Sequence, residues 1–414
     1  MSQEQPAKLW NRNFSILWAG LIQSYLGDAF LEIGLLWLVI ELTGSPLAAA
    51  GILALEGIPK LLGPLAGVVI DRSSKRFVVI MADLTRGLVL VLVYGLYVAG
   101  LLAVWQLYFL VVILGSMTIF YGPAMRVMLP TLIPDSALPA ANSAIQGGQP
   151  VAMIVGASLA GILLATIGTP AALLVDGISF LIAALALSLV HFPAGLLQRK
   201  QLSARAVWQD MIGGLRFIFF TMQVLMLTGL AFFINLVLSP VNVIFPFFSQ
   251  NILGQGVEGF GFLATAIAVG LLLGSVAAGV VGDRISYVWS ILLGLVGMTL
   301  ALISLSFAQS LIVALVITAM LGFMTPFIQI PLVSRLQRAV PPGYQGRVFA
   351  TLGTLVSLST PLAAALAGQA LSTLPIPFIF RAAAVGTLLV AVIWFLFSLR
   401  QHESTGQPGS VGST

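Results

Sequence analysis

The chain has 414 residues, of which 59% are hydrophobic and only 7% are charged, and its formal net charge is +5. Soluble globular domains carry roughly 25% charged residues, so this composition excludes a water-soluble fold. The sequence contains no cysteine, which excludes disulfides, thiol nucleophiles and thiolate metal sites.

Apolar runs of about 20 residues recur from Phe14 to Arg400, and each can cross a hydrocarbon core roughly 30 Å thick as a helix. Taken between breaks at Gly, Pro and charged residues, these runs predict twelve membrane-spanning helices. In chain order they cover residues 14–40, 47–70, 77–100, 105–125, 140–166, 172–191, 221–250, 258–282, 289–308, 310–333, 347–371 and 378–400. The sequence therefore predicts an all-α polytopic membrane protein.

The distribution of Lys and Arg predicts the topology, because these residues concentrate in cytoplasmic loops. If the N-terminus lies inside, the loops on that side contain most of the 18 Lys and Arg residues. We therefore expect both termini in the cytoplasm and a multi-pass protein of the cell (inner) membrane. The basic balance does not indicate a nucleic-acid partner, because no basic stripe with interleaved aromatic residues lies outside the predicted spans.

The longest break between apolar runs, HFPAGLLQRKQLSARAVWQDMIGGLRF, is basic at its start and amphipathic from Ala204 onward. It leaves six predicted spans on each side. The predicted domains are an N-terminal six-helix bundle at 1–191, a cytoplasmic linker with an amphipathic segment at 192–220, a C-terminal six-helix bundle at 221–400 and a cytoplasmic tail at 401–414.

A short repeat agrees with this division. GVVIDR begins at Gly67 and GVVGDR begins at Gly279, each after the second predicted span of its half. Secondary transporters are often built from such parallel repeats, with the substrate site at the repeat interface. The repeat therefore indicates two copies of one six-helix unit around a central cavity.

The first copy, GVVIDRSSKR, resembles the loop motif of the major facilitator superfamily, with Gly67, Asp71, Arg72, Lys75 and Arg76 in register. The second copy matches at Gly279, Asp283 and Arg284. Five further stretches resemble the branch of macrolide-efflux and drug:proton antiporters: LGDAF, ADLTRG, LPTLIPDSALPAANSA, VDGISFL and GRVFA. Enterobactin-type siderophore exporters and lysophospholipid flippases look similar. The resemblance implies twelve helices in two pseudo-symmetric bundles that work by alternating access.

The loop motifs are candidates for a gate, because a carboxylate beside cations can form charge-assisted hydrogen bonds between helices and hold one conformation. The predicted gating residues are Gly67, Asp71, Arg72, Lys75, Arg76, Asp83, Arg86, Asp283 and Arg284. Asp83 and Arg86 are included because we expect them near the cytoplasmic entrance of the third span. The alternative is that the loop cations only fix the topology.

Ionisable residues inside the predicted spans carry the sharpest functional signal, since each costs about 2.5 to 3.5 kcal/mol at mid-helix. Asp28 and Glu32 lie four apart, on one face of the first span, and Glu56 lies in the second. Burial and a second carboxylate nearby both favour protonation, so we predict proton coupling through these three acids. Alternatives stay open: a carboxylate that only bonds two helices together, and an ion pair between Glu56 and Lys60.

Polar and aromatic side chains in the spans describe a mostly apolar cavity with few polar groups, which is typical of small-molecule sites. The candidates are Ser24, Tyr25, Phe120, Tyr121, Gln146, Gln149, Phe233, Asn235, Ser239, Asn242, Gln329 and Thr351. We therefore expect a lipophilic or amphipathic cargo. Each polar stripe could equally join two helices by hydrogen bonds.

The sequence contains neither Gly-Lys-Ser nor Gly-Lys-Thr, so it has no P-loop ATP site. ATP hydrolysis by this chain is therefore not expected to drive transport. The sequence therefore predicts a secondary active exporter of drugs and macrolide-like compounds, driven by proton antiport. The alternatives are a lipid or lysophospholipid flippase and a siderophore exporter, with sodium as a further coupling ion.

We expect no cofactor and no metal, and the predicted partners are the lipophilic substrate, protons and the lipid bilayer, with a functional monomer. A membrane-embedded enzyme is not expected, because His191 sits at the end of a span and no acid-rich cluster appears.

Overall fold

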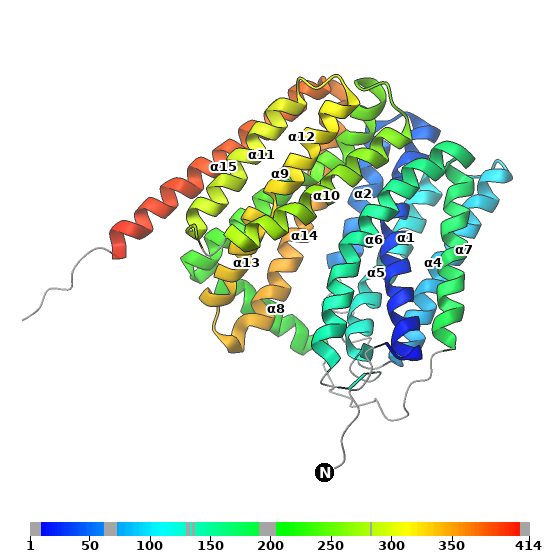
Figure 1. Ribbon diagram of the computed structural model, residues 1–414, viewed down its shortest axis with the longest axis horizontal. Coiled ribbons are helices and arrows are strands. Elements are labelled where there is room, and N and C mark those ends of the chain that lie inside the picture. Colours follow the sequence, from blue (N-terminus) through cyan, green and yellow to red (C-terminus); the bar gives the residue numbers. More distant parts are fainter. Residues whose placement is uncertain are drawn as a thin grey trace, which may run out of the picture.

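The computed structural model describes residues 10–61, 73–129, 133–134, 137–189, 204–281 and 284–405. Within these ranges the chain forms helices joined by short loops, without a strand (Figure 1). The N-terminal helices are α1 (Arg12–Thr43), α2 (Pro46–Leu61), α4 (Lys75–Val98), α5 (Val104–Met128), α6 (Leu138–Ile167) and α7 (Thr169–Ser188). After α8 (Ala204–Phe220), the C-terminal helices are α9 (Met222–Asn251), α10 (Val257–Val281), α11 (Tyr287–Leu305), α12 (Leu311–Met324), α13 (Pro326–Ala339), α14 (Pro342–Thr373) and α15 (Ile376–Thr405).

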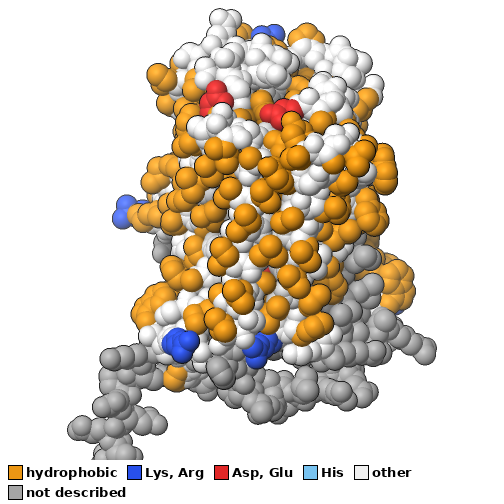
Figure 2. Space-filling view, turned by 90° about the vertical axis from the view of Figure 1, so that its right-hand side faces the viewer, with side chains coloured by type: hydrophobic (Ala, Val, Ile, Leu, Met, Phe, Trp, Pro, Cys, Tyr) orange, Lys and Arg blue, Asp and Glu red, His pale blue; other side chains and the backbone are white. Residues whose placement is uncertain are grey.

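Ten stretches of the described chain are long and apolar enough to cross a membrane. They comprise α4 to α7, α9 to α11, α14, α15, and α12 with α13 as one stretch, Leu311–Ala339. The other two predicted spans correspond to α1, which carries Asp28 and Glu32, and to α2, of which 16 residues are described. Hydrophobic side chains cover most of the middle of the face in Figure 2, with acidic groups near its top and basic groups near its bottom, at its top edge and at its left margin.

The loops at the predicted outer end turn on glycine. Gly44, Gly100, Gly168 and Gly254 have positive φ angles, a backbone conformation that glycine adopts without the strain of a side chain. At the opposite end, α1 begins with Asn11, whose side chain accepts a hydrogen bond from the Phe14 amide at 2.8 Å. These local signals set the lengths of the helices.

The two sets of helices repeat one packing pattern. Among the N-terminal helices α4 packs on α7, α1 on α6, and α2 on α5. Among the C-terminal helices the equivalent pairs, α11 with α15, α9 with α14, and α10 with α12, also pack together. This is the arrangement expected of two copies of one structural unit.

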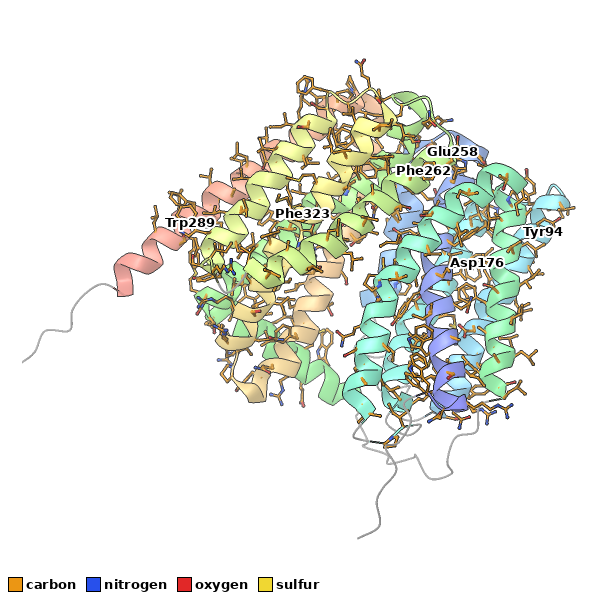
Figure 3. All side chains as sticks on the ribbon, viewed as in Figure 1. Tyr94, Asp176, Glu258, Phe262, Trp289 and Phe323 are labelled. Atoms are coloured by element: carbon orange, nitrogen blue, oxygen red, sulfur yellow. The ribbon has the colours of Figure 1, made fainter. Side chains whose placement is uncertain are left out.

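The two sets meet through α2 with α14 and through α6 with α10. Small residues allow these contacts: Gly161 of α6 lies against Gly261 of α10, and the hydroxyls of Ser158 and Thr265 are 2.8 Å apart. Glu258, at the start of α10, lies beside Gly161 and near the top of the molecule in Figure 3. The contacts therefore close the molecule towards its predicted outer end.

The amphipathic segment predicted from Ala204 onward is α8. It packs along the start of α14, where Gly214 lies against the backbone of Arg347 and the rings of Phe217 and Tyr344 stack at 5.3 Å. Trp208 stays exposed on α8. This helix connects the two sets and rests on the C-terminal one.

We expect Gly274→Ala to destabilise the protein by about 1–3 kcal/mol, the usual cost of overpacking. A Cβ at Gly274 of α10 would collide with the carbonyl oxygen of Phe323 in α12, and backbone cannot move aside as a side chain can. Thermal unfolding in detergent would measure the loss. The matched control is Gly279→Ala on the same helix, where a Cβ meets no heavy atom within 4 Å. Equal unfolding temperatures for the two variants would contradict the prediction.

Candidate functional site

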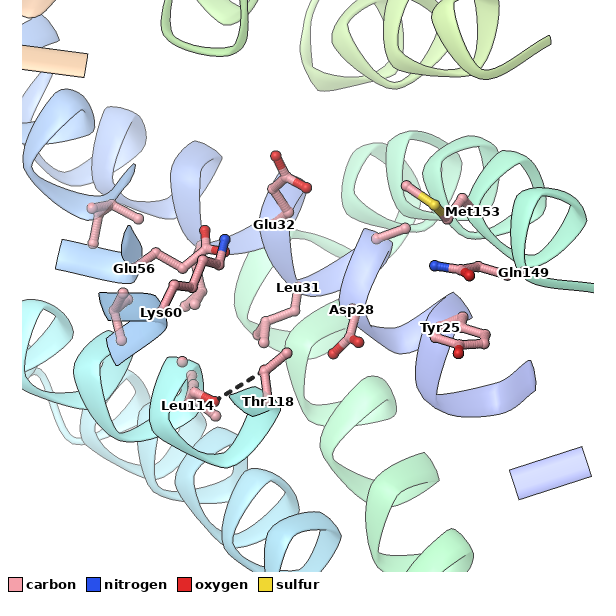
Figure 4. A pocket seen from close by; sticks show the side chains of 15 residues that line it. Tyr25, Asp28, Leu31, Glu32, Glu56, Lys60, Leu114, Thr118, Gln149 and Met153 are labelled. Carbon is pink, nitrogen blue, oxygen red and sulfur yellow. Dashed lines mark hydrogen bonds and ion pairs between the residues drawn. The ribbon is translucent and has the colours of Figure 1, made fainter. Parts of the chain in front are cut away.

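A cavity of about 300 Å³ opens among the N-terminal helices α1, α2, α5 and α6. Its acidic side chains are Asp28, Glu32 and Glu56 (Figure 4). Tyr25 and Gln149 add polar groups, and the remaining wall is mainly apolar, including Leu31, Leu35, Ile52, Val111, Leu114 and Met153. The cavity thus combines an apolar wall with a few ionisable groups.

The position of α1 brings its two acids to this wall. Gly27 and Gly34 let α7 approach closely, with Phe180 against the first and Leu173 against the second. The opposite face of α1 presents Asp28 and Glu32, four residues apart, to the cavity. The Asp28 side chain is 35% exposed, and Glu32 makes no hydrogen bond or ion pair within the described residues.

The third acid of the cavity is paired. Glu56 Oε1 lies 2.9 Å from Lys60 Nζ, one turn along α2. This is the ion pair that the i, i+4 spacing predicts. Glu56 is therefore neutralised within its own helix, which separates it from the unpaired Glu32.

Behind the cavity lies a buried arginine. The Arg86 side chain, on α4, is 1% exposed, and its Nη1 atom is 3.5 Å from Asp28 Oδ1 and 3.8 Å from Asp83 Oδ1. Nη1 donates a hydrogen bond to Ser24 Oγ at 3.0 Å, and Nη2 donates one to Thr118 Oγ1 at 2.9 Å. Arg86 thus joins α1, α4 and α5.

This geometry corrects the predicted location of Asp83 and Arg86. We expected both near the cytoplasmic entrance of the third span, but both are buried well inside α4, and Arg86 is level with Asp28. Asp176 of α7 is also buried, beside Gly27, with its Oδ1 atom 3.3 Å from Ser179 Oγ (Figure 3). Among the described residues, the N-terminal helices therefore hold five acids and two cations at the level of the cavity or behind it: Asp28, Glu32, Glu56, Asp83 and Asp176, with Lys60 and Arg86.

Part of the predicted gate falls outside the described residues. Gly67, Asp71, Arg72 and Asp283 lie outside them, and Lys75 begins α4. Arg76 donates a hydrogen bond to the carbonyl oxygen of Ser188, at the end of α7. Arg284 is exposed after α10. A role in gating stays a prediction for all these residues.

The predicted cavity residues separate into three groups. Tyr25 and Gln149 line the cavity of Asp28 and Glu32. Three others take part in helix packing, which corrects the prediction. Ser24 Oγ accepts a hydrogen bond from Arg86, and Tyr121 is 4% exposed under the Arg86 guanidinium. Thr351 of α14 is buried against α8. The remaining residues are outside this cavity: Phe120, Gln146, Phe233, Asn235, Ser239, Asn242 and Gln329.

Phe233 has a different environment from the one predicted. It lines a second, apolar cavity of about 300 Å³ between α9 and α15, together with Trp394 and Phe397. Asn235, two residues later, donates to the carbonyl oxygen of Ala231 in its own helix. One amide of the polar stripe formed by Asn235, Ser239 and Asn242 on α9 is thus hydrogen-bonded within its own helix, in line with the alternative that these stripes are structural.

Sequence reasoning missed Thr118 and Met153 as cavity residues and the pairing of Arg86 with Asp28. A signal for the pairing was present, since Arg86 interrupts an apolar run and an arginine in lipid needs a counter-charge. No such signal marked Met153, because a methionine in a membrane helix has the same pattern whether it faces a cavity or lipid.

The chain is similar to one described family and to several curated proteins. A family model described as transmembrane secretion effector, MFS_3, matches residues 5–411. Macrolide efflux protein A of Streptococcus pyogenes is 26% identical over 360 residues, which cover 85% of this chain and 88% of that protein. Multidrug efflux pump Tap of Mycolicibacterium fortuitum is 26% identical over 411 residues, which cover 95% and 97%.

Solved structures share the fold. A nucleoside transporter, NupG, superimposes with a TM-score of 0.76 at 12% identity, covering 92% of this chain and 98% of its own. The POT family transporter PepTSo gives a TM-score of 0.72 at 11% identity, covering 95% and 99%. At these identities the likeness concerns the arrangement of the helices alone.

Proposed function

Because the chain belongs to the MFS_3 family of transmembrane secretion effectors, which are multi-pass membrane transporters and not enzymes, we propose that it exports lipophilic or amphipathic small molecules by proton antiport. The relatives named as macrolide and multidrug efflux pumps support the cargo class and the direction. The observation that carries the proposal is the cavity of Asp28 and Glu32, where ionisable carboxyl groups share an apolar wall.

The transport cycle that we propose is alternating access by a monomer of twelve spans, with both termini in the cytoplasm. The contacts of α2 with α14 and of α6 with α10 would close the outer side, so that substrate enters from the cytoplasm. Protonation of Asp28 or Glu32 from outside would then neutralise buried charge and favour the return of the empty site. The Asp71 and Asp283 loops are proposed to lock the opposite, outward-facing conformation.

The proton gradient is sufficient for this work. One proton moving down 100 mV supplies roughly 2.3 kcal/mol. That free energy sustains a substrate gradient of about fiftyfold at best. One proton for each exported molecule can therefore drive export against a substantial substrate gradient.

The experiment that tests this function is uptake of a fluorescent lipophilic cation into proteoliposomes with an imposed pH gradient, acid inside, by protein facing inside out. The proposal expects accumulation with the pH gradient and none with a sodium gradient. If the sodium gradient alone drives accumulation, the coupling ion is wrong. If neither gradient does so while labelled lysophospholipid changes leaflet, the lipid flippase is the correct alternative. Movement of a siderophore alone would identify a siderophore exporter.

We expect Glu32→Gln to weaken binding of a lipophilic cation about tenfold, equivalent to about 1.4 kcal/mol. Glu32 makes no hydrogen bond or ion pair with any described residue, so its carboxylate is available to attract a cation without first leaving such a partner. Binding would be measured by equilibrium dialysis with tetraphenylphosphonium. A neutral lipophilic compound of similar size is the control, and we expect its affinity to stay within about twofold. Equal loss for both compounds would show that the substitution distorts the cavity.

A further inference from the structure

The buried group of Arg86, Asp28 and Asp83 includes two residues, Arg86 and Asp83, that have no contact with the substrate cavity. The Arg86 guanidinium lies over the rings of Tyr121 and Phe180, at 5.2 and 5.3 Å from their centroids, and its side chain is 1% exposed. It does not line the cavity. A cation within a membrane protein needs a counter-charge, because burial in a low dielectric is costly for an unpaired ion.

Two carboxylates compete for that counter-charge. Arg86 Nη1 is 3.5 Å from Asp28 Oδ1 and 3.8 Å from Asp83 Oδ1, so the same atom is within ion-pair distance of both acids. The hydrogen bonds of the guanidinium go to the hydroxyls of Ser24 and Thr118 instead. One cation therefore serves two acids, and its hydrogen bonds go to neutral hydroxyls that do not depend on which carboxylate is ionised.

The two acids differ in their access to the cavity. The Asp28 side chain is 35% exposed and lines the cavity, whereas Asp83 is fully buried. Neither carboxylate oxygen of Asp83 has a hydrogen-bond partner in the described part of the chain. A buried, ionised and unbonded carboxylate is unfavourable, so only one of the two acids can be compensated by Arg86 at a time and the other holds a proton.

We propose that Asp83 is a further proton-binding residue of the transporter, which exchanges the coupled proton with Asp28 while Arg86 pairs with whichever carboxylate is ionised. The inference rests on the proposed proton antiport. In the exchange an O–H bond breaks at one carboxyl group and forms at the other, and the total charge of the three residues does not change. Arg86 is a positioning residue, because it carries no proton to the substrate.

Other titratable groups surround the pair. Glu32 lies one turn along α1, Glu56 and Lys60 face the cavity from α2, Tyr121 approaches from α5, and Asp176 approaches from α7. Glu56 and Lys60 neutralise each other, and Asp176 has no ion pair with Arg86 within the described residues. Asp83 is therefore the acid that shares the Arg86 cation with Asp28.

The test is the release of protons when the purified full-length protein binds tetraphenylphosphonium, measured with a pH indicator in weakly buffered detergent solution. In Asp83→Asn, Arg86 pairs permanently with Asp28, which then stays ionised to lower pH. We expect the midpoint of proton release to move down by about 1 to 3 pH units. In Arg86→Met the shared cation is gone, and we expect the midpoint to move up by a similar amount. Shifts in opposite directions are not expected from two residues that only pack.

The matched control is Asp176→Asn, which removes another buried carboxylate of the same helices, and it should shift the midpoint less than Asp83→Asn. An unchanged midpoint in Asp83→Asn, with proton release intact in the wild type, would overturn this proposal alone. No proton release from the wild type would refute the antiport itself and this proposal with it. If Asp83→Asn does not fold, Asp83→Glu replaces it: the longer side chain changes the distance to Arg86, so an unshifted midpoint again overturns the proposal.

Discussion

Asp28→Asn is expected to abolish proton-driven export, so that the accumulation ratio falls from about fiftyfold to about one. Asp28 is the one acid that both lines the cavity and lies beside Arg86 among the described residues. The amide has nearly the same shape as the carboxyl group but cannot take up or release a proton. Substrate can still cross down its own gradient, because the cavity wall is otherwise unchanged.

Two assays separate these effects. Accumulation in proteoliposomes with an imposed pH gradient should disappear, while exchange of labelled for unlabelled substrate without a gradient should persist. Asp28→Glu keeps a carboxyl group and is expected to retain part of the accumulation. Gradient-driven accumulation by Asp28→Asn at the wild-type level would remove Asp28 from the coupling mechanism.

Gly261→Leu is expected to reduce transport about 5- to 150-fold by opening the contact between α6 and α10. A Cβ at Gly261 would meet the backbone of Gly161 and Ala157 in the facing helix, so the longer side chain forces the helices apart. Overpacking of this kind costs about 1–3 kcal/mol, which corresponds to that shift between two conformations. The contact joins the N-terminal and C-terminal helices, so each set should keep its own packing.

The absence of cysteine in the sequence permits a direct measurement, because spin labels can be attached to introduced cysteines without background. Leu101→Cys and Phe307→Cys are suitable, since both residues are exposed near the predicted outer end. We expect longer distances between the labels in Gly261→Leu than in the wild type. Gly147→Leu, on α6 where a Cβ meets no heavy atom within 4 Å, is the control. An unchanged distance distribution in Gly261→Leu would show that this contact does not close the outer side.

The sequence predicted best those features that depend on neighbours along one helix. Asp28 and Glu32 face the same cavity, and Glu56 pairs with Lys60, because a spacing of four residues places side chains together on any α-helix. The apolar length of a span is local in the same sense, which is why ten spans follow from composition. Such predictions need no knowledge of how helices are arranged.

The misplaced residues depend on contacts between helices. Ser24 and Tyr121 were expected on the cavity wall, yet both lie around Arg86, which comes from another helix. In lipid every polar group must find a partner, so a hydroxyl that lines a cavity and one that joins two helices leave the same pattern in the sequence. Arg86 was assigned to the gate because we expected it near the cytoplasmic entrance of the third span, and its position along the span does not show which helix it faces.

The Asp28 cavity is lined by the N-terminal helices alone, and this one-sided arrangement has a consequence for evolution. Substitutions in the C-terminal helices can reshape the opposite surface for a new compound without touching the carboxylates. A population under selection by an unfamiliar antibiotic could then acquire resistance by single mutations in one half of the gene, while the other half is held constant. Deep mutational scanning with several antibiotics would reveal this as drug-specific tolerance in one half and drug-independent constraint in the other.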